Sequence, residues 1–229
     1  MNAQLEPLLE LYARRRSARG FHPTPLDADT LHALFEAAQR APSWCNVQPW
    51  QVVVTEPPAT AALTAALVDA ATQRPAETGA EVAFPSAYPS PYRERRRACG
   101  GALYQAMGIA RDDEAGRHRA WLRNYQAFDA PHVAIVSCDR RLGAYAYVDV
   151  GVWLGYLLVA AESLGVGTCP MASLASYPAV LRRHLPIEED SVILFGLALG
   201  TADPSCAANA CRTARESSKS AIQVVSRLR

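Results

Sequence analysis

The sequence lacks the marks of a secreted, disulfide-linked or metal-binding protein. Residues 1–16 hold no apolar core beside a cleavage site, and their basic residues follow the apolar ones, so we expect no secretion signal. The six cysteines include no CxxC pair, which argues against a disulfide framework and a zinc knuckle. The five histidines are dispersed without the spacing of metal ligands. These absences predict reduced thiols, no bound metal and a cytoplasmic location.

Excess charge and long apolar runs are missing as well. The formal net charge is +1 over 229 residues, of which half are hydrophobic and a fifth are charged, as in a folded domain rather than a disordered tail. A general nucleic-acid binder would be more basic. The apolar run at residues 150–161 is bounded by Asp149 and Glu162 and is short of the roughly 20 residues that cross a bilayer. We therefore expect no nucleic-acid or membrane partner, and one domain over residues 1–229.

Hydrophobic periodicity and turn residues predict helices and a few strands that alternate around one sheet, in an α+β fold. Asp27 is the expected cap of the second helix, and Pro42 is expected to end it. The predicted helices are residues 5–14, 27–41, 60–74, 142–164 and 177–186, and the predicted strands include residues 48–56 and 131–139. Residues 75–130 interrupt this pattern with proline-rich turns and two basic helical stretches, and we interpret them as an inserted cap or lid.

Two features point to a second subunit. Residues 150–161 are apolar on every side of their helix, which predicts that the helix is buried, and packing against another chain would complete that burial. Residues 220–229, SAIQVVSRLR, form a strand-like tail after a polar segment. A terminal strand so far beyond the core is expected to pair with a partner chain.

The segment RRRSARGF, residues 14–21, places four arginines within six positions. A cluster of this kind forms a solvated surface, a nucleic-acid patch or a phosphate clamp. The cluster alone does not separate these three possibilities, so the rest of the sequence has to.

Three separated stretches together resemble the FMN-dependent nitroreductase family: RRRSARGF, APSWCNVQPWQVVV at residues 41–54, and GVGTCPMASLASYPAVL followed by FGLALGTADP. They occur in the family's order and at its spacing. The insertion with YPSPYRERRR and the APHVAI strand are most similar to the nitrobenzoate-reductase branch. The resemblance implies a mixed central sheet wrapped by helices, an intertwined homodimer with C-terminal strand exchange, and FMN sites at the subunit interface.

The resemblance assigns the arginine cluster to the FMN phosphate, a dianion that guanidinium binds with paired hydrogen bonds. It implies that Arg15 and Ser17 bind the phosphate, that Arg16 binds the phosphate or the ribityl region, and that Arg19 binds the ribityl chain or the pyrimidine edge. Arg14 is expected to remain at the surface.

Two arginines near the C-terminus, Arg212 and Arg215, are expected to close this clamp. The family usually has one position between its two basic residues there, whereas this chain has two. This difference mostly affects the expected contribution of Arg212 to phosphate binding.

Two further segments match those that lie along the flavin ring. Along one side the matching residues are Pro42, Ser43, Trp44 and Asn46, and Trp44 either stacks on substrate or fills the core. Over the other face the matching residues are Pro170, Met171, Ala172 and Ser173, where a backbone N–H would approach flavin N5. Some members of the family carry a glutamate at the position of Ala172, whose absence bears on nicotinamide preference.

The resemblance implies a ping-pong reaction without a catalytic side chain, in which NADH or NADPH delivers hydride to the flavin and a nitroaromatic compound then accepts two electrons. The lid residues Tyr88, Arg95, Arg97 and Tyr125 are candidates for substrate contact, and an arginine there would pair with an aromatic carboxylate such as a nitrobenzoate. A solvated basic helix is the alternative for these residues. Rival readings of the chain are another flavin-dependent reductase or dehydrogenase, a non-catalytic FMN-binding protein, and a nucleic-acid or anion-binding module.

Overall fold

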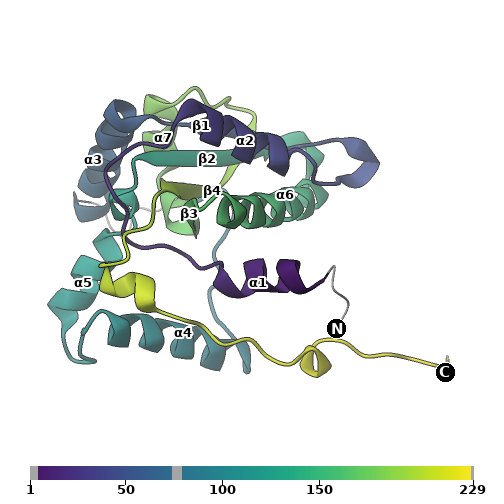
Figure 1. Ribbon diagram of the computed structural model, residues 1–229. Helices are drawn as coiled ribbons and strands as arrows, with labels where there is room; N and C mark the ends of the chain where they lie inside the picture. The colour runs from purple at the N-terminus through teal and green to yellow at the C-terminus, as the bar shows by residue number, and fades with distance from the viewer. Residues whose placement is uncertain (1–4, 74–78, 228–229) are drawn as a thin grey trace.

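A four-stranded sheet lies at the centre of the fold (Figure 1). The computed structural model describes residues 5–73 and 79–227. The strand order is β1-β2-β4-β3, and all three strand pairings are antiparallel. The strands are β1 (Gln51–Val54), β2 (His132–Asp139), β3 (Gly167–Met171) and β4 (Ser191–Gly200).

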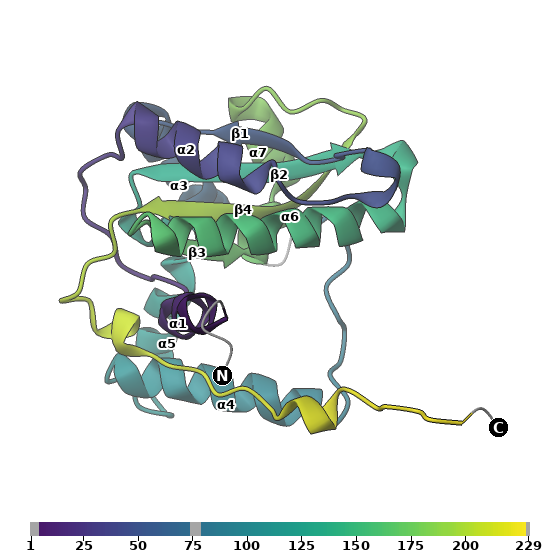
Figure 2. The ribbon, with the colours of Figure 1, turned by 45° about the vertical axis from the view of Figure 1, so that its right-hand side comes forward.

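Helices cover both faces of the sheet (Figures 1 and 2). The helices α3 (Pro57–Gln73) and α7 (Pro178–His184) pack on one face, and α2 (Ala28–Ala38) and α6 (Ala144–Ser163) pack on the other. Each face of the sheet has its own cluster of buried apolar side chains. The prediction of an α+β fold is confirmed.

The capping prediction for α2 is also confirmed, because the Asp27 carboxylate accepts a hydrogen bond from the Thr30 backbone N–H at 2.7 Å.

The helices α1 (Glu6–Arg14), α4 (Tyr92–Ala106) and α5 (Glu114–Leu122) and the C-terminal segment lie to one side of the sheet (Figures 1 and 2). The helix α1 packs near α6, while α4 and α5 form an arm beyond it. The C-terminal segment runs beside α4, where Arg95 and Glu216 pair at 3.5 Å. The arm spans most of the predicted lid, whose residues 75–78 lie outside the described part of the chain.

The long helix α6 is buried along only one face. Ala146, Val150, Trp153, Leu157 and Ala161 are buried against the sheet and α2. Its other face carries exposed apolar side chains, namely Tyr145, Val148, Val152 and Tyr156. Among the described residues, α6 is the one helix long and apolar enough to cross a membrane, and core helices of folded domains pass the same test. The prediction that this helix is buried is therefore confirmed for one face, and the other stays open.

One sequence-based expectation about strands needs correction, and a second stays a prediction because it concerns a partner chain. The sheet is antiparallel rather than mixed, and the parallel pairing found among the described residues is the isolated bridge between Ser17 and Thr168. The predicted C-terminal strand is not formed in residues 220–227, which follow a short 3-10 turn at Ser218–Ser220. A strand requires a neighbour for its N–H and C=O groups, and this tail lies beside none of the sheet's strands within one chain. Its pairing with a partner chain therefore stays a prediction.

The predicted strand at residues 48–56 begins only at Gln51. Asn46 and Gln48 have φ angles of 55° and 51°, a left-handed conformation that interrupts an extended chain before the strand can start. Pro57 and Pro58 end the strand as expected, and Pro57 also opens α3, because a first-turn proline needs no N–H donor there.

A buried carboxylate attaches the segment before the arm to the sheet. Glu81 accepts hydrogen bonds from the Ile193 backbone N–H at 2.9 Å, from Arg140 at 2.6 Å and from Arg182 at 3.2 Å. Burial opposes ionisation of Glu81, but these donors outweigh it and hold the pKa of the carboxyl below its ordinary value of 4.5. The start of the arm is thereby held at one place on the sheet.

We predict that Glu81→Gln lowers the free energy of unfolding at neutral pH by about 2 kcal/mol or more, because Arg182 then loses its buried counter-charge. The pKa of Glu81 is depressed in the folded state, so its contribution is present above the unfolded pKa and lost as the pH falls through the folded pKa. Urea unfolding should thus show the two proteins converging in stability below about pH 4. The exposed Glu188→Gln is the control, and an equal loss in that variant would contradict the prediction.

Candidate functional site

The arginine segment leaves α1 and docks directly on the sheet. Ser17 bridges to Thr168 of β3, and the Ala18 backbone N–H donates to the Thr168 carbonyl at 2.8 Å. Ala18 is buried, whereas Arg15, Arg16 and Arg19 are partly exposed. The backbone of the segment is therefore fixed while its guanidinium groups extend from it.

A buried amide holds the other end of this segment. The side chain of Asn209 accepts from the Arg19 backbone N–H at 2.5 Å and donates to the carbonyls of Gly20 at 2.9 Å and Asp203 at 2.8 Å. A Cβ on Gly20 would lie 2.4 Å from Cys206 Sγ, so this close approach requires glycine. Sequence reasoning missed Asn209, because its contacts are with backbone atoms far away along the chain.

Two partly exposed side chains at the site each have one buried polar atom without a partner in the described part of the chain. Arg16 Nε and Ser173 Oγ have no hydrogen-bond partner among the described residues. Buried polar atoms are nearly always paired in folded proteins, so each orphan indicates a missing acceptor or donor. Both belong to segments that the sequence assigned to the cofactor, and an anionic, hydrogen-bonding ligand would satisfy them.

The thiol of Cys169 in β3 is affected by the positive charges of the arginine segment. Burial raises the pKa of its thiol to about 11, while the nearby positive charges of Arg19 and Arg15 act in the opposite direction. The thiol is therefore protonated at neutral pH and does not act as a nucleophile. The bridge from Ser17 to Thr168 attaches the arginine segment to β3 just before Pro170, Met171, Ala172 and Ser173, which agrees with the effect of the Arg15 and Arg19 charges on Cys169.

The two C-terminal arginines differ in position. Arg212 donates to the carbonyls of Asn209 at 2.9 Å and Cys211 at 3.0 Å, which keeps it beside the amide that holds Arg19. Arg215 is exposed and donates to the neighbouring Thr213 and Ala214. Contacts within this chain thus connect Arg212 to the arginine segment and leave Arg215 in the tail.

The second predicted ring-binding segment, which contains Pro42, Ser43, Trp44 and Asn46, forms a strained turn. Ser43 Oγ accepts from the Gln48 N–H at 2.9 Å, and Trp44 packs edge-on against Tyr145 with ring centroids 4.9 Å apart. Trp44 is 63% exposed, so its assignment to the core is wrong. Its ring remains available to a ligand or to another protein surface.

The turn at Trp44 and the arginine segment lie near opposite ends of α6 (Figure 2). The Trp44 N–H donates to Asp149 at 3.1 Å, and Arg14, next to the arginine segment, pairs with Glu162 at 3.3 Å. Thirteen positions of helix, at 1.5 Å each, place these anchors about 20 Å apart. A flavin ring is shorter than the distance between these two anchors in one chain.

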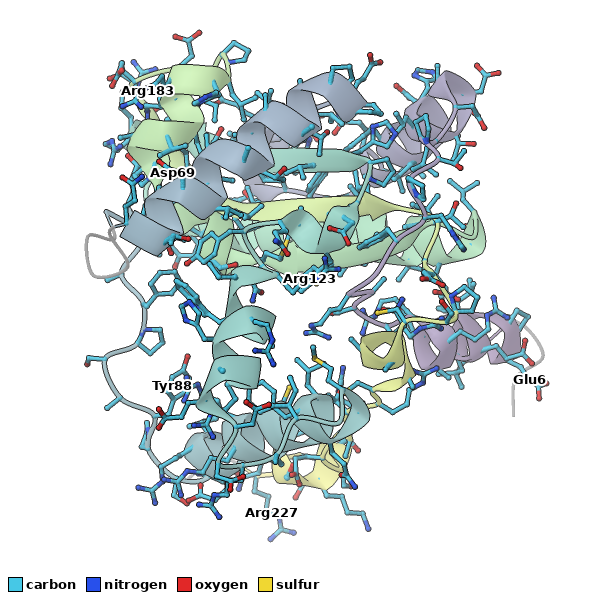
Figure 3. The ribbon with its side chains drawn as sticks, turned by 90° about the vertical axis from the view of Figure 1, so that its left-hand side faces the viewer. Glu6, Asp69, Tyr88, Arg123, Arg183 and Arg227 are labelled. Carbon is cyan, nitrogen blue, oxygen red and sulfur yellow. The ribbon has the colours of Figure 1, made fainter. Side chains whose placement is uncertain are left out.

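The predicted substrate residues are not gathered in one place. On the arm, Arg96 lies over the Tyr88 ring at 5.1 Å and Arg95 lies over Tyr92 at 5.8 Å, and Arg97 is exposed. Figure 3 shows Tyr88 beside the arm, away from the sheet.

Tyr125 belongs to the core rather than to a lid surface. It is 3% exposed and packs against Trp121 and Tyr177, and burial is the main cause of its raised pKa. A side chain enclosed in this way has no free face for a substrate.

Comparison with known proteins points to one family. The family model described as "Nitroreductase family" matches residues 12–201. A 4-nitrobenzoate reductase of Pseudomonas putida is 33% identical over 204 residues, which is 89% of each chain. The crystal structure of an FMN-dependent nitroreductase, NfnB of Mycobacterium smegmatis, in complex with NADPH superposes with a TM-score of 0.91 at 30% identity and covers 97% of this chain and 99% of that one. The FMN and NADPH-dependent NfnB of Sphigopyxis sp. strain HMH has the same TM-score at 34% identity, with 95% and 98% covered.

We predict that Asn209→Ala lowers the free energy of unfolding by roughly 2 to 4 kcal/mol, because it leaves one backbone N–H and two carbonyls unpaired in a buried place. Urea unfolding measures the change. Gln73→Ala, which removes an exposed amide at the end of α3, should change stability by less than about 0.5 kcal/mol. Equal effects of the two substitutions would show that Asn209 does not hold the arginine segment.

Proposed function

Because the chain belongs to the nitroreductase family, we propose that it is an FMN-dependent NAD(P)H oxidoreductase that reduces nitroaromatic compounds, nitrobenzoates among them. Support comes from the family match over residues 12–201 and from relatives whose names give nitroaromatic reduction, FMN and NADPH. The observation that carries the proposal is the arginine segment docked on β3, in which Arg16 Nε is buried without a hydrogen-bond partner among the residues described, as is Ser173 Oγ on the loop after β3.

The residues at the site fit FMN. Its phosphate is a dianion, and Arg15, Arg16 and Ser17 offer the paired guanidinium and hydroxyl donors that bind one. The orphaned Arg16 Nε needs an acceptor, which a phosphate or ribityl oxygen supplies. Arg19 and Arg212, joined through Asn209, extend the positive charge toward the rest of the cofactor.

FMN supplies the two-electron transfer between nicotinamide and nitro group when it is bound. The protein would hold the cofactor in place and supply positive charge beside it. The backbone after β3, at Ala172 and Ser173, offers N–H donors on a segment fixed by the sheet, and the guanidinium groups of Arg15 and Arg19 stabilise negative charge added beside them. The buried thiol of Cys169 stays protonated, so no nucleophilic side chain competes with this chemistry.

The functional unit in this proposal is a homodimer of single-domain subunits in the cytoplasm. A groove of about 760 Å³ runs between α1 and the open face of α6, lined mainly by apolar side chains. Gly151 and Gly155 have open space where a Cβ would stand, so a partner helix can approach closely. A second copy would cover this face and bring the Trp44 turn of one chain to the arginine segment of the other, with the arm and its flanking residues, 79–130 in all, as cap.

We predict that the purified protein binds FMN, that NADPH or NADH bleaches its visible absorption without oxygen, and that 4-nitrobenzoate then restores the colour. Arg15→Ala and Arg19→Ala should each weaken FMN binding about 10-fold or more, because a charge-assisted hydrogen bond contributes about 1.5 to 3 kcal/mol. Titration of the apoprotein with FMN measures the affinity.

The matched control is Arg14→Ala, whose exposed pair with Glu162 contributes little. Protein that binds no FMN would overturn the proposal. If nicotinamide fails to reduce the bound flavin, the protein is a non-catalytic FMN-binding protein. If the flavin is reduced but nitroaromatic compounds fail to reoxidise it, the protein is a different flavin-dependent reductase.

We predict that the protein sediments as a dimer at micromolar concentration, at twice the 24.8 kDa of one chain. Gly155→Arg should produce monomers that have lost most of their FMN, because the side chain blocks the close approach of a partner helix. Ala62→Arg on the exposed side of α3 is the control and should leave the dimer intact. Sedimentation of the unaltered protein as a monomer would contradict the shared site, whatever the variants do.

A further inference from the structure

Two adjoining cavities lie between the arm and the arginine segment. The larger has a volume of about 550 Å³ and the smaller about 180 Å³. Both are lined by Arg19, Met107, Ala120, Arg123 and Ala208. Because Arg19 belongs to the proposed cofactor clamp, a ligand in these cavities would lie next to it.

The linings of the two cavities differ in chemistry. The larger one has three arginines, Arg19, Arg119 and Arg123, and no carboxylate among its lining residues. The smaller one is lined by the aromatic rings of Tyr104, Trp121 and Phe128. An aromatic pocket that opens into a cationic one suits a molecule with a ring at one end and an acid group at the other.

The guanidinium of Arg123 is held in place with donors to spare. Its Nη1 donates to Asp129 at 2.6 Å and lies 3.5 Å from Gln126, and among the described residues its Nε and Nη2 make no hydrogen bond. Asp129 belongs to a left-handed turn with Ala127 and Phe128, all with φ between 48° and 64°. That turn sets Phe128 against the aromatic cavity and Asp129 against Arg123.

We propose that these cavities form a binding site for an aromatic carboxylate, with its ring between Tyr104, Trp121 and Phe128 and its carboxylate paired with Arg123 and Arg119. The identification of this ligand with the nitro acceptor rests on the proposed function. The site replaces Arg95 and Arg97 as the acid-recognising residues, because Arg95 already pairs with Glu216 and neither lines these cavities.

The test is calorimetric titration of the protein, supplied with FMN and without nicotinamide, with 4-nitrobenzoate and with uncharged nitrobenzene. Arg123→Gln should weaken 4-nitrobenzoate binding about 10- to 100-fold and change nitrobenzene binding less than about 3-fold, since the lost interaction is charge-assisted. Arg183→Gln on α7 removes the same charge from an exposed position far from Arg123 (Figure 3) and should change neither.

A second variant, Arg119→Gln, keeps the test open if Arg123→Gln fails to fold, because Arg119 is exposed and should also weaken binding of the acid selectively. No binding of 4-nitrobenzoate to the unaltered protein, or equal losses for both ligands, would overturn the site. Binding of the acid that depends on Arg123, in a protein that never reduces it, would support the site and overturn the proposed nitroaromatic reduction.

Discussion

The buried amide of Asn209 is the interaction on which the candidate site depends. It satisfies one backbone N–H and two backbone carbonyls from two segments, and it fixes the arginine segment where a Cβ on Gly20 would collide with Cys206. Four guanidinium groups so close along the chain repel one another, and this cost is offset by backbone pairing with β3 and Asn209 rather than by carboxylates. Only Arg14 has an acidic partner among the described residues, so the other three are left to attract an anion.

The contacts of α6 show which of its surfaces one chain leaves uncovered. Docking on the sheet uses one face of α6, and the other face keeps its glycines and apolar side chains open. The two groups of predicted cofactor residues are anchored near opposite ends of that helix. A second copy packed on the open face would solve both problems at once, because it would bury the apolar surface and bring the two groups together.

Local features of this fold could be predicted from the sequence, and features made by distant backbone atoms could not. Asp27 caps α2 as its side chain and position indicate, since the donor lies three residues away. The Arg19 N–H and Asn209 are 190 positions apart, and Glu81 meets Ile193 across 112. The late start of β1 also escaped prediction, because the strand pattern of residues 48–56 gives no sign of the left-handed conformations at Asn46 and Gln48 that precede Gln51.

The arm shows why counting arginines along a sequence does not locate an acid-binding site. The RERRR run on α4 attracts notice, yet Arg95 and Arg96 lie over tyrosine rings and Arg95 pairs with Glu216. Arg119 in α5 and Arg123 at its C-terminal cap form no run, but one turn of helix brings both to the larger cavity, and Arg123 also lines the smaller cavity with its aromatic rings. An arginine can bind an acid when its guanidinium group has unused donors beside a cavity, and only the tertiary structure shows which arginines meet this condition.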